Sequence, residues 1–125
     1  MIDHISVGVS DLDRSATFYE AALGALGLAR LVTRPRTVGF GKAYPEFWIN
    51  LREGMPRVPA ESGVHISLRA KTTAEIDAFH AAAVSAGGVS DGAPGLRPHD
   101  RVRYYAAFVL DPDGNRIEAV TFPSE

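Results

Sequence analysis

The sequence predicts an α+β fold in which two tandem βαβββ modules form a cup-shaped, curved mixed sheet with helices on the outer face. Two observations predict this fold. The order strand, helix, strand, strand, strand occurs twice, as shown by the alternation and spacing of apolar residues. A constant shift also places His4-Ile5-Ser6 on His65-Ile66-Ser67. We therefore expect a single domain over residues 1–125, with modules at about 1–52 and 63–122 and a linker at 53–62.

The first module begins with a half-buried strand over residues 2–9, in which apolar and polar residues alternate. A helix follows in residues 11–27, with Ser10 as its expected N-cap. Its apolar residues recur at helical spacing and comprise Leu12, Ala16, Tyr19, Ala22, Leu23 and Leu26. Three short strands are expected at 28–33, 37–42 and 46–52, separated by prolines.

The second module repeats this order, starting with a strand at 63–70. Thr72 and Glu75 form a capping box before a helix over 73–88, whose predicted buried residues are Ile76, Phe79, Ala83 and Val84. Residues 90–103 are rich in Gly, Pro and Arg, which predicts an irregular loop. The last two strands are expected at 104–110 and 116–122, joined by a turn at 111–115.

Composition excludes several classes of protein. The net charge of −2 gives no basic surface for nucleic acid or anionic membrane. The absence of cysteine excludes a disulfide scaffold, a thiolate zinc site and a cysteine nucleophile. No apolar run approaches the ~20 residues of a membrane span, and no secretory signal is recognisable, so we expect a cytoplasmic protein.

The repeat also predicts a site. It makes His4 and His65 equivalent, and a slightly larger shift places Asn50 on Glu118. All four residues fall on the polar faces of their strands, so they converge if the two half-sheets curl around one concave face. Two imidazoles and a carboxylate suit a divalent first-row metal. The alternative is that each histidine is a hydrogen-bonded structural residue, and that Asn50 and Glu118 are structural or solvated.

Several motifs support a family resemblance. They comprise Asp3-His4, Val9-Ser10-Asp11-Leu12 with Phe18-Tyr19, His65-Ile66-Ser67-Leu68, and residues 107–114 followed by Ile117-Glu118. With these motifs the chain resembles the vicinal oxygen chelate superfamily, which includes glyoxalase I, fosfomycin- and bleomycin-resistance proteins, extradiol dioxygenases and methylmalonyl-CoA epimerase. The resemblance implies a divalent metal (Zn, Mn, Ni or Fe) held by His4, His65 and Glu118, which chelates neighbouring oxygens of a small substrate.

Two residues depart from relatives in this superfamily. Asn50 stands where glyoxalase I carries a glutamate, and an amide cannot act as a general base, so glyoxalase I activity is disfavoured. The resemblance also makes Asn50 a candidate fourth ligand through its carbonyl oxygen, because epimerase-type members tolerate an amide here. Phe108 stands near the position of a tyrosine in fosfomycin-resistance and extradiol relatives. Tyr104 shares its face, about 13 Å further along the strand at ~3.4 Å per residue.

These observations predict a small metalloenzyme whose reaction is left open among isomerase, lyase, dioxygenase and thiol-transferase chemistry. The residues expected to line the substrate site are Ser6, Trp48, Ser67, Arg69, Tyr104 and Phe108, with 92–103 as a lid. No residue for proton transfer is identified. The alternative function is metal-free binding or sequestration of a small molecule, as in bleomycin-resistance members. We also expect a homodimer, in which the modules pair within one chain or are exchanged between two.

Overall fold

The computed structural model describes residues 1–124. Its first module contains β1 (Ile5–Val9), α1 (Leu12–Gly24), β2 (Ala29–Thr33), β3 (Thr37–Gly41) and β4 (Pro45–Leu51). A short 3₁₀ helix, η1 (Ala60–Ser62), lies in the connection to the second module. That module contains β5 (His65–Arg69), α2 (Thr73–Ser85), β6 (Val89–Arg97), β7 (Tyr104–Leu110) and β8 (Arg116–Thr121). The order strand, helix, strand, strand, strand is therefore present twice, as predicted.

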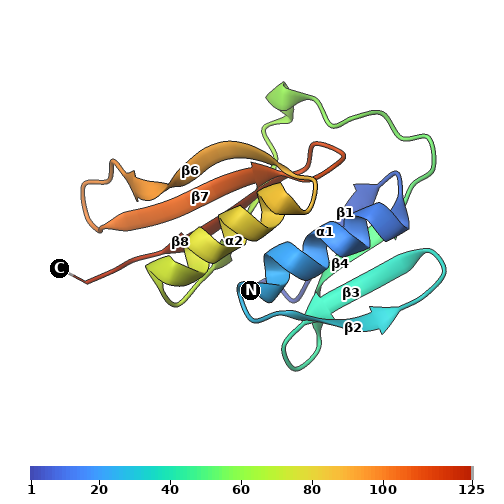
Figure 1. The fold of residues 1–125 in the computed structure, drawn as a ribbon, viewed down its shortest axis with the longest axis horizontal. Coiled ribbons are helices and arrows are strands. Elements are labelled where there is room, and N and C mark those ends of the chain that lie inside the picture. Colours follow the sequence, from blue (N-terminus) through green and yellow to red (C-terminus); the bar gives the residue numbers. More distant parts are fainter. Residues whose placement is uncertain (125) are drawn as a thin grey trace.

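Each module forms its own four-stranded sheet, in the orders β1-β4-β3-β2 and β5-β8-β7-β6. The β1–β4 and β5–β8 pairs are parallel, and the other neighbours are antiparallel. Figure 1 shows α1 lying across the first sheet and α2 across the second, and the two helices pack against each other. The α+β class and the tandem βαβββ arrangement are thereby confirmed, while the two sheets do not close into one.

One apolar core spans both modules. Phe18 on α1 is fully buried and packs at Gly88, where an added Cβ would lie 2.5 Å from the Phe18 ring. Tyr19 places its ring 4.8 Å from that of Phe18 and 4.9 Å from that of Phe47. The first helix therefore packs against residues of both halves of the chain, which fixes the two sheets relative to each other.

The prediction of an irregular loop at 90–103 is wrong for its first half, because β6 runs from Val89 to Arg97. The glycines that signalled a loop lie at irregularities in the β6–β7 register, between Ser90 and Gly92 and between Gly92 and Gly95. Bulges of this kind let a Gly- and Pro-containing segment pair as an edge strand. The Arg97 side chain donates to the carbonyl oxygens of Gly95 (2.9 Å) and Ala93 (2.7 Å), which supports the irregular backbone.

Two further details differ from the sequence-based expectation. The N-cap of α1 is Asp11, whose carboxylate accepts from the Arg14 amide at 3.0 Å, because the Ser10 hydroxyl is engaged by Asp113. Val84 is 43% exposed, so it lies outside the buried face of α2. The second capping prediction is confirmed, since Thr72 Oγ1 accepts from the Glu75 amide at 3.1 Å.

No helix within residues 1–124 is both long enough and apolar enough to cross a membrane.

Candidate metal and substrate site

A buried carboxylate is the central feature of the second sheet. Glu118 on β8 is only 1% exposed, yet it points to the face of the sheet opposite α2. Its Oε1 lies 3.1 Å from His65 Nε2 on β5, and its Oε2 accepts a hydrogen bond from the Tyr104 hydroxyl on β7. Three strands therefore contribute one polar cluster. A carboxylate at this depth is stable because both of its oxygens are paired.

Tyr104 reaches this cluster although its backbone lies four residues beyond the strand partner of Glu118, which is Phe108. The hydrogen bond to Glu118, followed by burial and the negative charge of that carboxylate, raises the pKa of Tyr104 to about 12. The phenol is therefore protonated and acts as a donor at neutral pH. The distance of about 13 Å estimated earlier separates the backbones of Tyr104 and Phe108. The long Tyr104 side chain crosses this distance and reaches Glu118.

His4 lies just before β1, and its side chain is 54% exposed. Its Nδ1 is 2.6 Å from Asp3 Oδ1, so its nearest carboxylate is that of its chain neighbour. His4 and His65 both line a cavity of about 480 Å³ between the start of β1 and β5, together with Glu46. The structure thus brings the two predicted imidazoles to one cavity, while Glu118 pairs with the His65 imidazole and not with that of His4.

No group of three His, Asp or Glu side chains within residues 1–124 is arranged to hold a metal ion. The chain presents a pair of donors, His65 and Glu118, on its second sheet and a separate donor, His4, beside β1. The donor types match those that divalent first-row metals prefer. The pair alone would leave at least two coordination positions of a four-coordinate metal open.

Strand register alters the expected position of Asn50. Ser6 lies opposite Trp48 on the first sheet, as Ser67 lies opposite Glu118 on the second. Trp48, rather than Asn50, therefore occupies the place structurally equivalent to Glu118. The sequence repeat missed this because it aligned Ile49 with Ile117, whereas the strand register aligns Trp48 with Glu118, two positions away. Asn50 lies two residues further along β4, and its Oδ1 accepts from Thr37 Oγ1 at 2.6 Å.

The first sheet presents an aromatic surface around Trp48. Gly39 lies beside it on β3, where an added Cβ would be 2.8 Å from the indole ring. Arg34 places its guanidinium 5.6 Å from the indole centroid. The missing side chain at Gly39 thus leaves room for the indole ring beside β3, and Trp48 offers apolar surface where the second sheet has the Glu118 carboxylate.

The predicted lining residues of the second module share the face of Glu118. All four of them, Ser67, Arg69, Tyr104 and Phe108, lie there together with the predicted ligand His65, and we call this surface the second open face. Phe108 contacts His65, with ring centroids 6.2 Å apart. The sequence reasoning missed Phe122, whose ring lies 4.5 Å from the Arg69 guanidinium. Strand alternation from Glu118 through Val120 could have identified it.

Comparisons with known proteins agree with this fold. The profile of the Glyoxalase/Bleomycin resistance protein/Dioxygenase superfamily matches residues 1–119. A glyoxalase/bleomycin resistance protein from Albidiferax ferrireducens is 34% identical, with 96% of this chain and 98% of that chain covered and a TM-score of 0.85.

Two more distant structures support the fold alone. A glyoxalase-related enzyme from Fulvimarina pelagi is 20% identical, covering 96% of this chain and 86% of that one with a TM-score of 0.74. A glyoxalase I mutant from Zea mays is 22% identical, covering 94% of this chain but 45% of that one, with a TM-score of 0.72. A search of curated proteins gave no match to the chain.

Proposed function

Since the chain belongs to the Glyoxalase/Bleomycin resistance protein/Dioxygenase superfamily, we propose that it is a metal-dependent enzyme acting on a small molecule with two neighbouring oxygens. The ligands of the divalent ion (Zn, Mn, Ni or Fe) are His4, His65 and Glu118, with Asn50 as the fourth. The observation that carries the proposal is the Glu118 carboxylate, which is buried yet directed away from the apolar core and paired with an imidazole at 3.1 Å.

The chemistry divides between the ion and the chain. A bound divalent ion polarises the substrate oxygens and stabilises a developing enolate or oxyanion. The Tyr104 hydroxyl holds Glu118 in one orientation through its hydrogen bond. Phe108 and Trp48 exclude water from their sides of the site. Asn50 cannot remove a substrate proton near neutral pH, so a glyoxalase I reaction is disfavoured.

A homodimer is part of the proposal, because one chain does not bring His4 to the His65–Glu118 pair. In the exchanged arrangement, His4 and Asn50 come from one subunit, and His65 and Glu118 come from the other. The unpaired edges of β1 and β5, which end their sheets, offer surfaces for such an association.

The test is metal analysis of protein purified without chelator, followed by titration of the stripped protein with Zn²⁺, Mn²⁺, Ni²⁺ and Fe²⁺. We expect one ion per site for at least one metal. His65→Ala and Glu118→Gln should abolish stoichiometric binding, and Tyr104→Phe should weaken it by about 10- to 100-fold, as is typical of a group that orients a ligand. His80→Ala is the matched control, since His80 pairs with Ser90 on the far side of the module. Unchanged affinity in both His65→Ala and Glu118→Gln would refute the proposal.

A second candidate function is metal-free binding or sequestration of a small molecule. It is favoured by the absence of a three-donor group within residues 1–124 and by the position of the Trp48 indole, which lies on the first sheet where the second has Glu118. This function predicts that a screened small molecule binds tightly to chelator-treated protein and quenches the fluorescence of the single tryptophan. The affinity should be the same in His4→Ala. Binding that requires added metal would exclude it.

A further inference from the structure

Basic side chains gather at one end of the second open face. Residues 97–103 contain Arg97, Arg101 and Arg103 but only one carboxylate, Asp100. That carboxylate is 90% exposed and is paired with His99 at 3.7 Å rather than with an arginine. No ion pair joins these three arginines to a carboxylate within residues 1–124. The local charge is therefore positive.

A fourth arginine, Arg69, packs against an aromatic ring at this end of the second open face. The Arg69 guanidinium lies 4.5 Å from the centroid of the Phe122 ring. Tyr104 packs edge-on against Phe122 at 5.4 Å, and His99 stacks on Tyr104 at 5.9 Å. A cation–π contact positions a guanidinium without using its N–H groups. The Arg69 side chain makes no hydrogen bond within the part of the chain that the structure describes, so its donors are available to a ligand.

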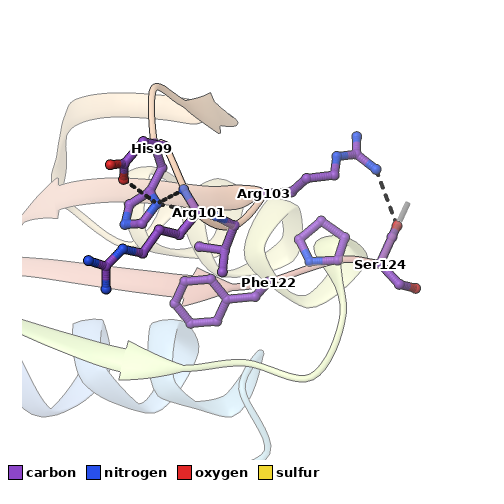
Figure 2. A pocket seen from close by; sticks show the side chains of 8 residues that line it. His99, Arg101, Arg103, Phe122 and Ser124 are labelled. Atoms are coloured by element: carbon purple, nitrogen blue, oxygen red, sulfur yellow. Dashed lines mark hydrogen bonds and ion pairs between the residues drawn. The ribbon is translucent and has the colours of Figure 1, made fainter.

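A cavity of about 440 Å³ opens at the same place, lined by residues 99–103 and 122–124. Figure 2 shows the Arg101 side chain extending on the Phe122 side of this cavity, whereas Arg103 points the opposite way. Arg103 donates to the Ser124 carbonyl oxygen at 3.2 Å. The Arg101 guanidinium has no hydrogen-bond partner within residues 1–124. Arg101 and Arg103 thus lie on the same loop, but only the Arg103 guanidinium is hydrogen-bonded to a residue within 1–124.

This basic end is continuous with the Glu118 cluster. Between them lie Ala106 and Val120, which are buried but belong to the open side of the sheet rather than to the main core. Ala106 pairs with Val120, and Arg69 flanks Val120 on the other side. Phe122 lies four positions after Glu118, just beyond the end of β8, or about 13 Å away at ~3.3 Å per residue. The Tyr104 side chain spans this distance, since its hydroxyl reaches Glu118, so an elongated molecule can lie along Tyr104 from Glu118 to the basic end.

From this arrangement we infer that the substrate is elongated and carries an oxyanion, a carboxylate or a phosphate, at its end remote from the chelated oxygens. Arg69 and Arg101 bind this oxyanion above the Phe122 ring. A guanidinium group presents two parallel N–H groups, whose geometry matches the oxygens of a carboxylate or a phosphate. The inference deepens the proposed function and rests on it for the position of the reacting end.

The test measures the subsite without the metal. Chelator-stripped protein is titrated with inorganic phosphate and, separately, with succinate, and binding is followed by amide chemical shifts in NMR. We expect saturable shifts in residues 99–103 and 122–124 for at least one anion. Arg69→Gln and Arg101→Gln should each weaken binding about tenfold, the effect of losing a hydrogen bond between charged groups. Arg103→Gln is the matched control on the loop, and Arg52→Gln is a control in the first module.

The outcomes separate the subsite from the metal site. Saturable phosphate binding identifies a phosphate subsite, and saturable succinate binding identifies a carboxylate subsite. Binding of either anion by a protein that takes up no metal supports the subsite and refutes only the metalloenzyme. The inference is overturned if neither anion saturates, if Arg69→Gln and Arg101→Gln bind as tightly as the unmodified protein, or if Arg103→Gln weakens binding equally. Melting temperatures of the variants verify that each is folded.

Discussion

At the scale of single residues, the Asp111 side chain accepts several hydrogen bonds, although the sequence did not mark it as a site residue. This carboxylate is 1% exposed and accepts from the amides of Asp113 and Asn115, from Asn115 Nδ2 and from the Tyr19 hydroxyl. The fully buried Tyr19 comes from α1, so the contact joins the first helix to the turn between β7 and β8. Burial and the nearby Asp111 charge raise the pKa of Tyr19 well above its usual value.

Tyr19→Phe tests this contact. It removes a donor to a buried carboxylate, so we expect the free energy of unfolding to fall by about 1.5–3 kcal/mol. The measurement is urea denaturation at neutral pH. Tyr105→Phe is the matched control, because it removes an equally short hydrogen bond (2.6 Å) to Asp77 on an exposed part of the surface. An equal loss in the two variants would contradict a special role for the buried pair.

At the scale of elements, most strands and both helices follow from local patterns. Alternation predicts β1, β5, β7 and β8 because one face of each is covered by a helix. The sequence cannot reveal β6, because its pairing depends on bulges at Gly92 and on Arg97 bonds to the backbone, which are properties of the folded chain. Strand alternation places His65 and Glu118 on the polar faces of their strands, but the repeat matched Glu118 to Asn50 instead of Trp48. The reach of Tyr104 depends on a side-chain conformation, which strand alternation does not reveal.

Gly39→Ala probes the packing of β3 on β4. The added methyl group would meet the Trp48 ring at 2.8 Å and Pro45 Cβ at 3.0 Å. We expect a loss of stability of about 1–3 kcal/mol from overpacking, with a shift in tryptophan emission as the indole is displaced. Gly24→Ala is the control, since nothing lies within 4 Å of its Cβ at the end of α1. It should leave the emission unchanged and stabilise the helix by up to about 1 kcal/mol.

At the scale of the whole molecule, the separation of His4 from Glu118 gives the proposed dimer a decisive test. His4→Ala and Glu118→Ala chains are purified separately, then unfolded and refolded together. In an exchanged dimer, each mixed pair regains one complete site, so about a quarter of the sites should recover metal binding. Refolding each variant alone is the control. If the mixture recovers nothing and light scattering shows a monomer at micromolar concentration, the exchanged dimer is excluded.

The turn between β7 and β8 has a consequence for how the chain acquires its structure. Asp113 accepts hydrogen bonds from the amide and hydroxyl of Ser10, across a sequence separation of 103 residues. Tyr19 finds its partner 92 residues away. Closing such long loops costs entropy and slows folding. During synthesis, Tyr19 on α1 therefore leaves the ribosome before its acceptor, Asp111, has been made. The first module can form these hydrogen bonds only after the β7–β8 hairpin has been synthesised.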